Sequence, residues 1–409
     1  MNKVRWQTTL WIMFAAQLLS AVGFSVIFPF LPLYVADLGS STGMSIELLA
    51  GLVFSGQAIS MAIASPIWGS LSDRLGHKLM VERAMFGGAL ILLLMGFARS
   101  AEELVLLRVV QGMITGTVSA ANALVASVAP RDRIGYAMGT LQVGMWSGIA
   151  AGPLLGGVLA DAFGFRSPFL LTGGLLFAAG LLVFFGVKAG ERPAAKPKDQ
   201  RVGLLASWRT VMTAPGMLLA YSLRFLTSLG QTMLIPFVPL FIQSLMGDTD
   251  LLGTFTGLVV GIASAAGTAT AISLGKLGDR IGHRQVLIAC AFLTGVFYLP
   301  QSFVSEPWQL LVLQGLSGAA WGGITPAVSA LLARYSATGS EGAVYGLDNS
   351  IVSAARACAP LIGAGVVLAG GLRGIFLATA IAYMLIGILA ITRLRADQPT
   401  VATESRAGD

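Results

Sequence analysis

Four ionisable side chains interrupt long apolar runs of the sequence: Arg108, Arg224, Asp348 and Arg356. A charge inside a membrane-spanning helix is costly, so each is a candidate for ion coupling or substrate binding. At about 1.5 Å per helical residue, Asp348 and Arg356 lie about two turns apart and cannot pair with each other. Arg224 could pair with Asp348 across helices, either as a proton site or as a structural ion pair.

Arg108 lies about two turns from the end of its apolar run, in the stretch Leu-Val-Leu-Leu-Arg-Val-Val-Gln-Gly at 104–112. It could serve ion coupling, or it could be a structural anchor that reaches the surface or pairs with Asp37 at the end of the first run.

Other polar and aromatic residues of the apolar runs could line a substrate cavity or could simply pack. They are Gln111, Gln142, Met145, Trp146, Gln231, Trp321 and Asn349, together with Arg356. Three arginines stand against one clearly internal acid within the runs. We therefore expect a neutral to positive cavity that favours neutral, zwitterionic or anionic amphiphiles over simple cations.

The composition shows what kind of elements must position these side chains. Of 409 residues, 55% are hydrophobic and 11% are charged, against roughly a quarter charged in soluble domains. This excludes a disordered chain and an ordinary soluble enzyme, and it predicts an all-α polytopic membrane protein. Cys290 and Cys358 fall in apolar runs without a metal-binding pattern. We expect no cofactor and no metal.

About twelve apolar runs are long enough to span a membrane. They cover residues 8–36, 46–68, 79–98, 101–128, 135–160, 166–188, 214–243, 252–274, 284–303, 308–334, 342–369 and 374–393. Twenty Lys and Arg residues lie on one side of these runs and three on the other. This asymmetry predicts a multi-pass protein of the cell membrane with both termini in the cytoplasm. It also explains the net charge of +7 without a nucleic-acid partner.

The second half of the chain repeats the first at an offset of about 207 residues. Pro-Phe-Leu-Pro-Leu-Tyr at 29–34 matches Pro-Phe-Val-Pro-Leu-Phe at 236–241. We predict two pseudo-symmetric six-helix bundles, 1–188 and 211–409, joined by a cytoplasmic linker at 189–210. Such repeats place a binding site at their interface near the membrane midplane.

A polar motif follows the second run of each half. Gly-x-Leu-x-Asp-Arg-x-Gly-x-Lys at 69–78 resembles the signature loop of the major facilitator superfamily, and the resemblance covers nearly the whole chain. It implies that these loops latch the halves together at the cytoplasmic face. The latch residues would be Gly69, Asp73, Arg74, Gly76 and Lys78, then Gly275, Asp279, Arg280, Gly282 and Arg284, with Arg131 and Arg133 as partners of Asp73.

Two further motifs resemble those of drug/proton antiporters in this family. Gly148, Gly152 and Gly156 lie four residues apart on one helix face, where they allow close packing, and Pro153 and Gly157 accompany them. The arginine of the stretch 104–112 matches a family motif that is linked to proton coupling. The second half has Leu311 at the aligned position.

The resemblance implies a proton-coupled exporter of drugs or other amphiphilic small molecules, which we expect to act as a monomer. A metabolite, sugar or lipid transporter of the same fold is the alternative. We do not expect an enzyme, because no paired carboxylates, His/Asp cluster or serine elbow appears. No GxxxxGK[ST] loop is present to bind ATP.

Overall fold

The computed structural model describes residues 3–130, 133–187, 212, 216–247, 249, 251–335 and 341–394. Within them every element is helical. The first half holds α1 (Lys3–Ile27), α2 (Leu31–Leu38), α3 (Ile46–Leu75), α4 (His77–Gly96), α5 (Ala101–Ile114), α6 (Thr117–Val128), α7 (Ile134–Phe163) and α8 (Ser167–Gly186). The second holds α10 (Met217–Leu234), α11 (Phe237–Met246), α12 (Leu252–Ile281), α13 (His283–Tyr298), η3 (Pro300–Phe303), α14 (Pro307–Trp321), α15 (Ile324–Tyr335) and α16 (Glu341–Arg393). The predicted linker at 189–210 lies outside these residues.

Several spans are broken into two helices. The first span divides into α1 and α2 beside Pro29, and the seventh divides into α10 and α11 beside Pro236. Proline has no backbone N–H to give to the helix, which explains both breaks. The α5–α6 break has Gly116 at φ 144°, a conformation that glycine adopts without a steric penalty.

The helices account for the twelve expected spans. Nine described stretches are long and apolar enough to cross a membrane. The last of them, Leu347–Arg393, contains two spans, because Gly371 (φ 72°) turns the chain inside α16. The broken pairs α5–α6 and α14–α15 supply the other two.

The backbone repeats along with the sequence. Gly76 (φ 97°) and Gly282 (φ 103°) make the same tight turn after α3 and α12. Gly164 (φ 79°) and Gly371 (φ 72°) turn the chain before the last span of each half. These positive φ angles disfavour residues with a Cβ atom, so the duplicated turns depend on glycine.

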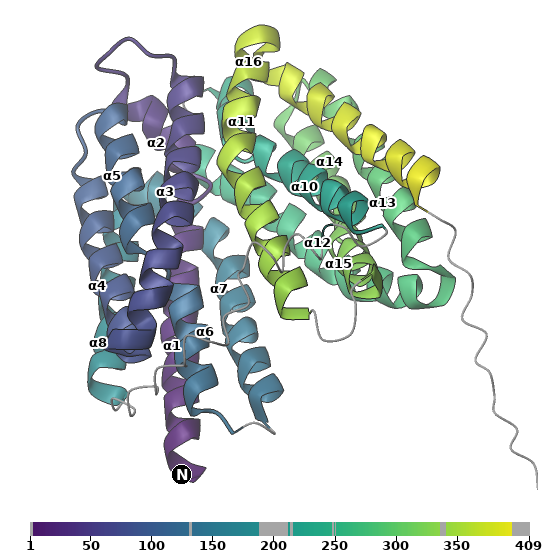
Figure 1. Cartoon of the computed structure of the whole chain (residues 1–409). Coiled ribbons are helices and arrows are strands. Elements are labelled where there is room, and N and C mark those ends of the chain that lie inside the picture. The colour runs from purple at the N-terminus through teal and green to yellow at the C-terminus, as the bar shows by residue number, and fades with distance from the viewer. Residues whose placement is uncertain are drawn as a thin grey trace, which may run out of the picture.

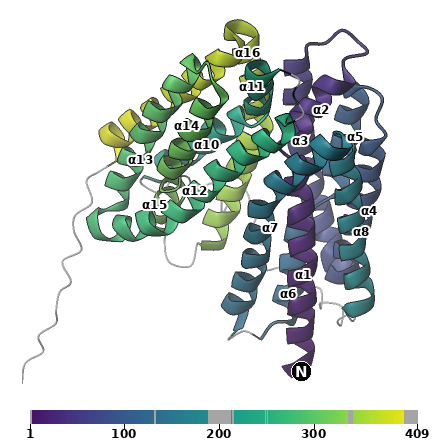
Figure 2. The same ribbon diagram turned by 180° about the vertical axis from the view of Figure 1, so that it is seen from behind.

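The halves stand side by side and meet at only one end (Figure 1). The reverse view shows the same divergence toward the end where α1 begins (Figure 2). We call that end the N-terminal side and the opposite end the far side. The packed cores follow the same division. One core, which contains Phe30 and Phe237, includes residues of both halves. Two others lie entirely within one half, around Tyr383 and around Trp6 respectively.

Candidate substrate cavity

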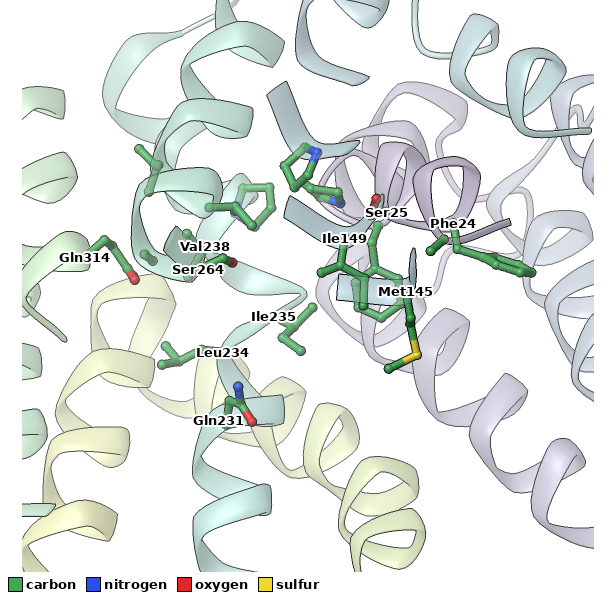
Figure 3. A pocket seen from close by; sticks show the side chains of 18 of the residues that line it. Phe24, Ser25, Met145, Ile149, Gln231, Leu234, Ile235, Val238, Ser264 and Gln314 are labelled. Carbon is green, nitrogen blue, oxygen red and sulfur yellow. The ribbon is translucent and has the colours of Figure 1, made fainter. Parts of the chain in front are cut away.

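A cavity of about 470 Å³ lies between the two halves, next to the shared core. Side chains from both halves point into it, including Met145 and Ile149 on one wall and Gln231 and Ile235 on the other (Figure 3). Most of its lining is apolar. The polar lining residues are Gln17, Ser20, Ser25, Thr117, Gln231, Ser264, Tyr298 and Gln314. None of the lining residues is an Asp, Glu, Lys, Arg or His.

The breaks and bends of the spans shape this cavity. Pro29, Pro153 and Pro239 all line it. A proline removes one helical hydrogen bond and leaves a backbone carbonyl free, which gives an apolar wall isolated acceptors. Ser25, which also lines the cavity, donates its hydroxyl to the carbonyls of Val22 (3.1 Å) and Gly148 (2.9 Å).

Arg224 of α10 and Asp348 of α16 form a bidentate ion pair toward the N-terminal side. Nε and Nη2 of the guanidinium donate to the two carboxylate oxygens at 3.0 and 3.2 Å. Both side chains are about 15% exposed. The pairing that the sequence allowed is therefore present, and the two charges compensate each other.

Arg356 lies on α16 about two turns beyond Asp348 and is exposed. Gln231 lies at a matching distance beyond Arg224 on the adjacent α10, so Arg356 and Gln231 are at a similar depth. Among the described residues, Arg356 has no hydrogen bond or ion pair. Arg356 was expected at the cavity wall but is not among the residues that line it. With Arg224 neutralised, Arg356 is the unpaired positive charge at the depth of Gln231, which does line the cavity.

Arg108 is buried inside the first half, with 3% of its surface exposed. Its Nε donates to the Val53 carbonyl at 3.3 Å and its Nη1 to Oε1 of Gln111 at 2.6 Å. Arg108 does not pair with Asp37, which was one of the alternatives that the sequence left open, because Asp37 is exposed on α2 at the far side. The prediction that Gln111 lines the cavity was wrong. It is fully buried, because Arg108 holds it inside the half.

The other residues expected at the cavity wall divide into two groups. Met145 and Gln231 line it. Gln142, Trp146 and Asn349 are exposed but do not line it, and Trp321 is half-buried. Trp146, 57% exposed, directly follows Met145 on α7 but does not share its place in the cavity wall.

Comparison with known proteins identifies this architecture. The family model described as Major Facilitator Superfamily matches residues 13–267 and again 220–409. The chain belongs to the major facilitator superfamily. It is a secondary transporter with multiple membrane spans, as the superfamily's members are.

Named relatives and solved structures agree with this assignment. The chain is 36% identical over 379 residues to Multidrug resistance protein MdtG of Salmonella arizonae, covering 92% of this chain and 93% of that protein. It is 37% identical over 385 residues to MdtG of Dickeya zeae, with 93% of each covered. The fold matches the nucleoside transporter NupG (TM-score 0.78, 12% identity, 94% and 99% covered). It also matches a bacterial homologue of the lysosomal transporter Spinster, solved facing inward (TM-score 0.79, 15% identity, 95% and 97% covered).

The superfamily's signature loops lie on the N-terminal side, where the halves are apart. Gly69, Asp73 and Arg74 belong to the last turns of α3, but their side chains and Arg131 are outside the described part. Lys78 donates to the Phe184 carbonyl at 2.9 Å, and the equivalent Arg284 donates to the Ile391 carbonyl at 2.8 Å. Each loop is thus fixed to the last helix of its own half.

The remaining latch candidates lie in the turns and helix ends of these loops. Gly76 and Gly282 form the two turns, Gly275 lies within α12, and Arg280 and Arg133 are exposed. Asp279 pairs with His283 at 3.2 Å within its own half.

The glycines of the antiporter motif have two different partners. Gly148, Gly152 and Gly156 face α1, where a Cβ atom on each would meet α1 or the residues just after it. Gly157 faces the other half instead, with its ideal Cβ position 2.5 Å from the Gly253 carbonyl oxygen. The sequence predicted the close packing of this face but not its division between α1 and α12.

Sequence reasoning missed one contact between the halves. Asp161, near the end of α7, accepts hydrogen bonds from the backbone N–H groups of Gly253 and Thr254, both at 2.7 Å. The Thr254 hydroxyl donates to it as well, at 2.5 Å. An acid at the edge of a span resembles an ordinary loop residue. Its only signal was its position shortly after the antiporter motif.

Proposed function

We propose that this transporter exports drugs or other amphiphilic small molecules in exchange for protons, by alternating access. The relatives' printed names, multidrug resistance proteins, support drug efflux. The packing of Gly148, Gly152 and Gly156 against α1 supports the interpretation of these glycines as an antiporter motif. In this proposal the chain works as a monomer in the cell membrane, with halves at 1–188 and 211–409.

The observation that carries the proposal is the cavity between the halves. Its 470 Å³ fits a small organic molecule, and its mostly apolar lining with isolated amides and hydroxyls suits an amphiphile. No lining residue is charged, and the unpaired Arg356 is at the same depth as Gln231 of the cavity wall. We therefore propose neutral, zwitterionic or anionic substrates rather than simple cations.

The shape supports an inward-open state. If the N-terminus is cytoplasmic, as the distribution of Lys and Arg indicates, the N-terminal side is the cytoplasmic side and the far side is external. The separate core of each half on the cytoplasmic side then leaves the cavity open to the cytoplasm. Closing that side would bring the loops at 69–78 and 275–284 together as the proposed latch.

Proton coupling has three candidate sites in this proposal. Arg108 is buried without an acid partner among the described residues, and the acid Asp348 is paired with Arg224. Asp37 remains a candidate at the external rim. Protonation of Asp348 would release Arg224, which links proton binding to a charge change beside the cavity.

The test measures lumenal pH in proteoliposomes that hold a preset acid-inside gradient, with a panel of amphiphiles added outside. Substrate-dependent release of lumenal protons is the expected result. It should be absent from empty liposomes and should be largest for neutral or anionic compounds. Binding of the same compounds without proton movement would contradict antiport and favour facilitated transport of another solute class.

Two variants locate the coupling. Asp348→Asn should abolish proton release while substrate binding to the purified protein persists. Arg108→Ala is tested beside Leu311→Ala, its aligned position in the second half. If Arg108 acts in coupling, only its variant loses proton release at unchanged binding. A loss of thermal stability with intact coupling would show that Arg108 is a structural anchor.

A further inference from the structure

The far side of the interface holds a contact between the halves that lies outside the transport cavity. There the N-terminus of α12 lies against the end of α7, and Asp161 crosses from one half to the other. Each carboxylate oxygen accepts a backbone N–H of the first turn of α12, and the Thr254 hydroxyl adds a third bond. Hydrogen bonds to an ionised carboxylate are roughly twice as strong as neutral ones.

Asp161 performs the role of a helix cap for α12. The residue in the cap position, Leu251, has no side chain that can accept a hydrogen bond, and α12 has no cap of its own. The first N–H groups of a helix need acceptors, and the helix dipole favours a negative charge there. Here both needs are met by a residue of the other half.

The internal repeat provides a comparison within the same molecule. The equivalent helix α3 is capped locally, because the Ser45 side chain accepts from the N–H of Leu48 at 3.4 Å. The residue equivalent to Asp161 is Leu368, an exposed aliphatic side chain that cannot cap anything. The contact between α7 and α12 therefore contains a cap that the opposite half supplies, whereas the equivalent contact between α16 and α3 does not.

The surrounding backbone leaves room for this cap. The ideal Cβ position of Gly253 lies 2.6 Å from Oδ1 of Asp161 and 2.9 Å from the Gly157 carbonyl oxygen. Any larger side chain at 253 would displace the carboxylate. The acid also lies at the C-terminal end of α7, where the helix dipole disfavours a negative charge. The position is thus unfavourable for an ionised carboxylate within its own half, and the hydrogen bonds that stabilise the carboxylate come from the other half.

We propose that Asp161 is the residue that holds the far side of this transporter closed. Opening the far side must separate α7 from α12, which breaks all three bonds and leaves the α12 N-terminus uncapped. Asp161 then sets the balance between the two open states without touching substrate. The proposal rests on alternating access by this chain, but not on its substrate or on proton coupling.

The test measures distances between spin labels in nanodiscs, in a Cys290→Ala/Cys358→Ala background and without substrate. Labels at Arg99 and Ser305, equivalent exposed positions of the two halves, report the far side. Labels at Leu79 and Gln285, again equivalent and exposed, report the N-terminal side. Asp161→Asn should raise the ratio of far-side-open to far-side-closed protein at least about tenfold, since a bond to a charged group contributes about 1.5–3 kcal/mol. The two label pairs should change in opposite directions.

Two further variants keep the result interpretable. Thr254→Val removes one of the three bonds and should shift both distances in the same direction by a smaller factor. Ser45→Ala removes the equivalent cap within a single half, and should lower thermal stability without moving either distance distribution. Unchanged distances in both Asp161→Asn and Thr254→Val would overturn the proposal. A Ser45→Ala shift as large as that of Asp161→Asn would do so too. Because the readout involves no substrate or proton flux, failure of the proposed efflux activity would leave this result unaffected.

Discussion

The Cα of Gly257 on α12 packs directly against the carbonyl oxygen of Pro153 on α7, with no room for a Cβ atom. The contact recurs at the other crossing of the halves, where the ideal Cβ position of Gly51 lies 2.9 Å from the Pro360 carbonyl oxygen. Gly51 and Gly257 are equivalent positions of the repeat, as are Pro153 and Pro360. The halves therefore touch through two matching glycine–proline contacts, both without intervening side chains.

Gly257→Ala should disturb the far-side contact. The added methyl group overlaps a backbone oxygen that cannot rotate away, so we expect the far-side-closed state to lose about 1–3 kcal/mol, as in overpacked interiors. Thermal unfolding of the purified protein and substrate transport should both decline. Gly51→Ala should have a smaller effect, because its Cβ has more room.

Gly261→Ala is the matched control for this substitution. It lies one turn further along α12 and has no heavy atom within 4 Å of its ideal Cβ position. Alanine favours a helix over glycine by about 1 kcal/mol, so stability should be unchanged or higher. Equal losses for both variants would show that glycine is needed for helix flexibility rather than for this contact.

The Arg224–Asp348 pair should behave as a coupled unit. Arg224→Met or Asp348→Leu alone leaves a largely buried charge unpaired, which costs about 3–5 kcal/mol of unfolding free energy. The double variant removes both charges and should recover most of that loss. Chemical denaturation in mild detergent measures all three, with Arg393→Met, an exposed position at the end of α16, as a control expected within about 0.5 kcal/mol of the parent. Additive losses would show that the pair contributes no coupling energy.

The sequence predicted the features that depend on one helix or on the repeat. The sequence allowed Arg224 to pair with Asp348 across helices, and the structure pairs them. The motif repeats at 69–78 and 275–284, and Gly76 and Gly282 make equivalent turns there. Contacts between distant segments were not predictable in the same way. Hydropathy gives the depth of a residue, whereas its partner depends on helix rotation.

Arg108, Gln111 and Asp161 show this limit. Nothing in the stretch 104–112 shows that Arg108 turns inward to Gln111 rather than outward to Asp37, because both are within reach of a long side chain. Asp161 finds its partners about ninety residues away in the other half. That contact follows only once the two bundles are placed together.

The packing of α1 against α7 should be intolerant of a single methyl group. The ideal Cβ position of Gly152 lies 2.6 Å from the Ser25 Cβ, so Gly152→Ala should displace α1 and the Ser25 hydroxyl that lines the cavity. We expect both lower thermal stability and weaker substrate binding. Gly139→Ala on the same helix has open space around its Cβ and should match the parent in both measurements. Weaker binding by both variants would point to α7 flexibility instead of close packing.

The charge of Arg356 should determine how the transporter ranks substrates that differ only in their headgroup. A charge pair at 4 Å is worth about 1 kcal/mol in water and about 4 kcal/mol at an effective dielectric constant of about 20. Arg356→Gln should therefore weaken binding of a carboxylate amphiphile at least about fivefold. The primary amide with the same apolar body should bind within about twofold of its parent affinity. Arg356→Lys keeps the charge and should preserve most of the preference for the carboxylate. High salt should reduce this preference in the parent protein, because Arg356 is exposed and its charge can be screened. Equilibrium binding to the purified protein measures each combination. Equal weakening of both ligands by Arg356→Gln would mean that Arg356 supports the cavity wall, and that substrate charge is recognised elsewhere.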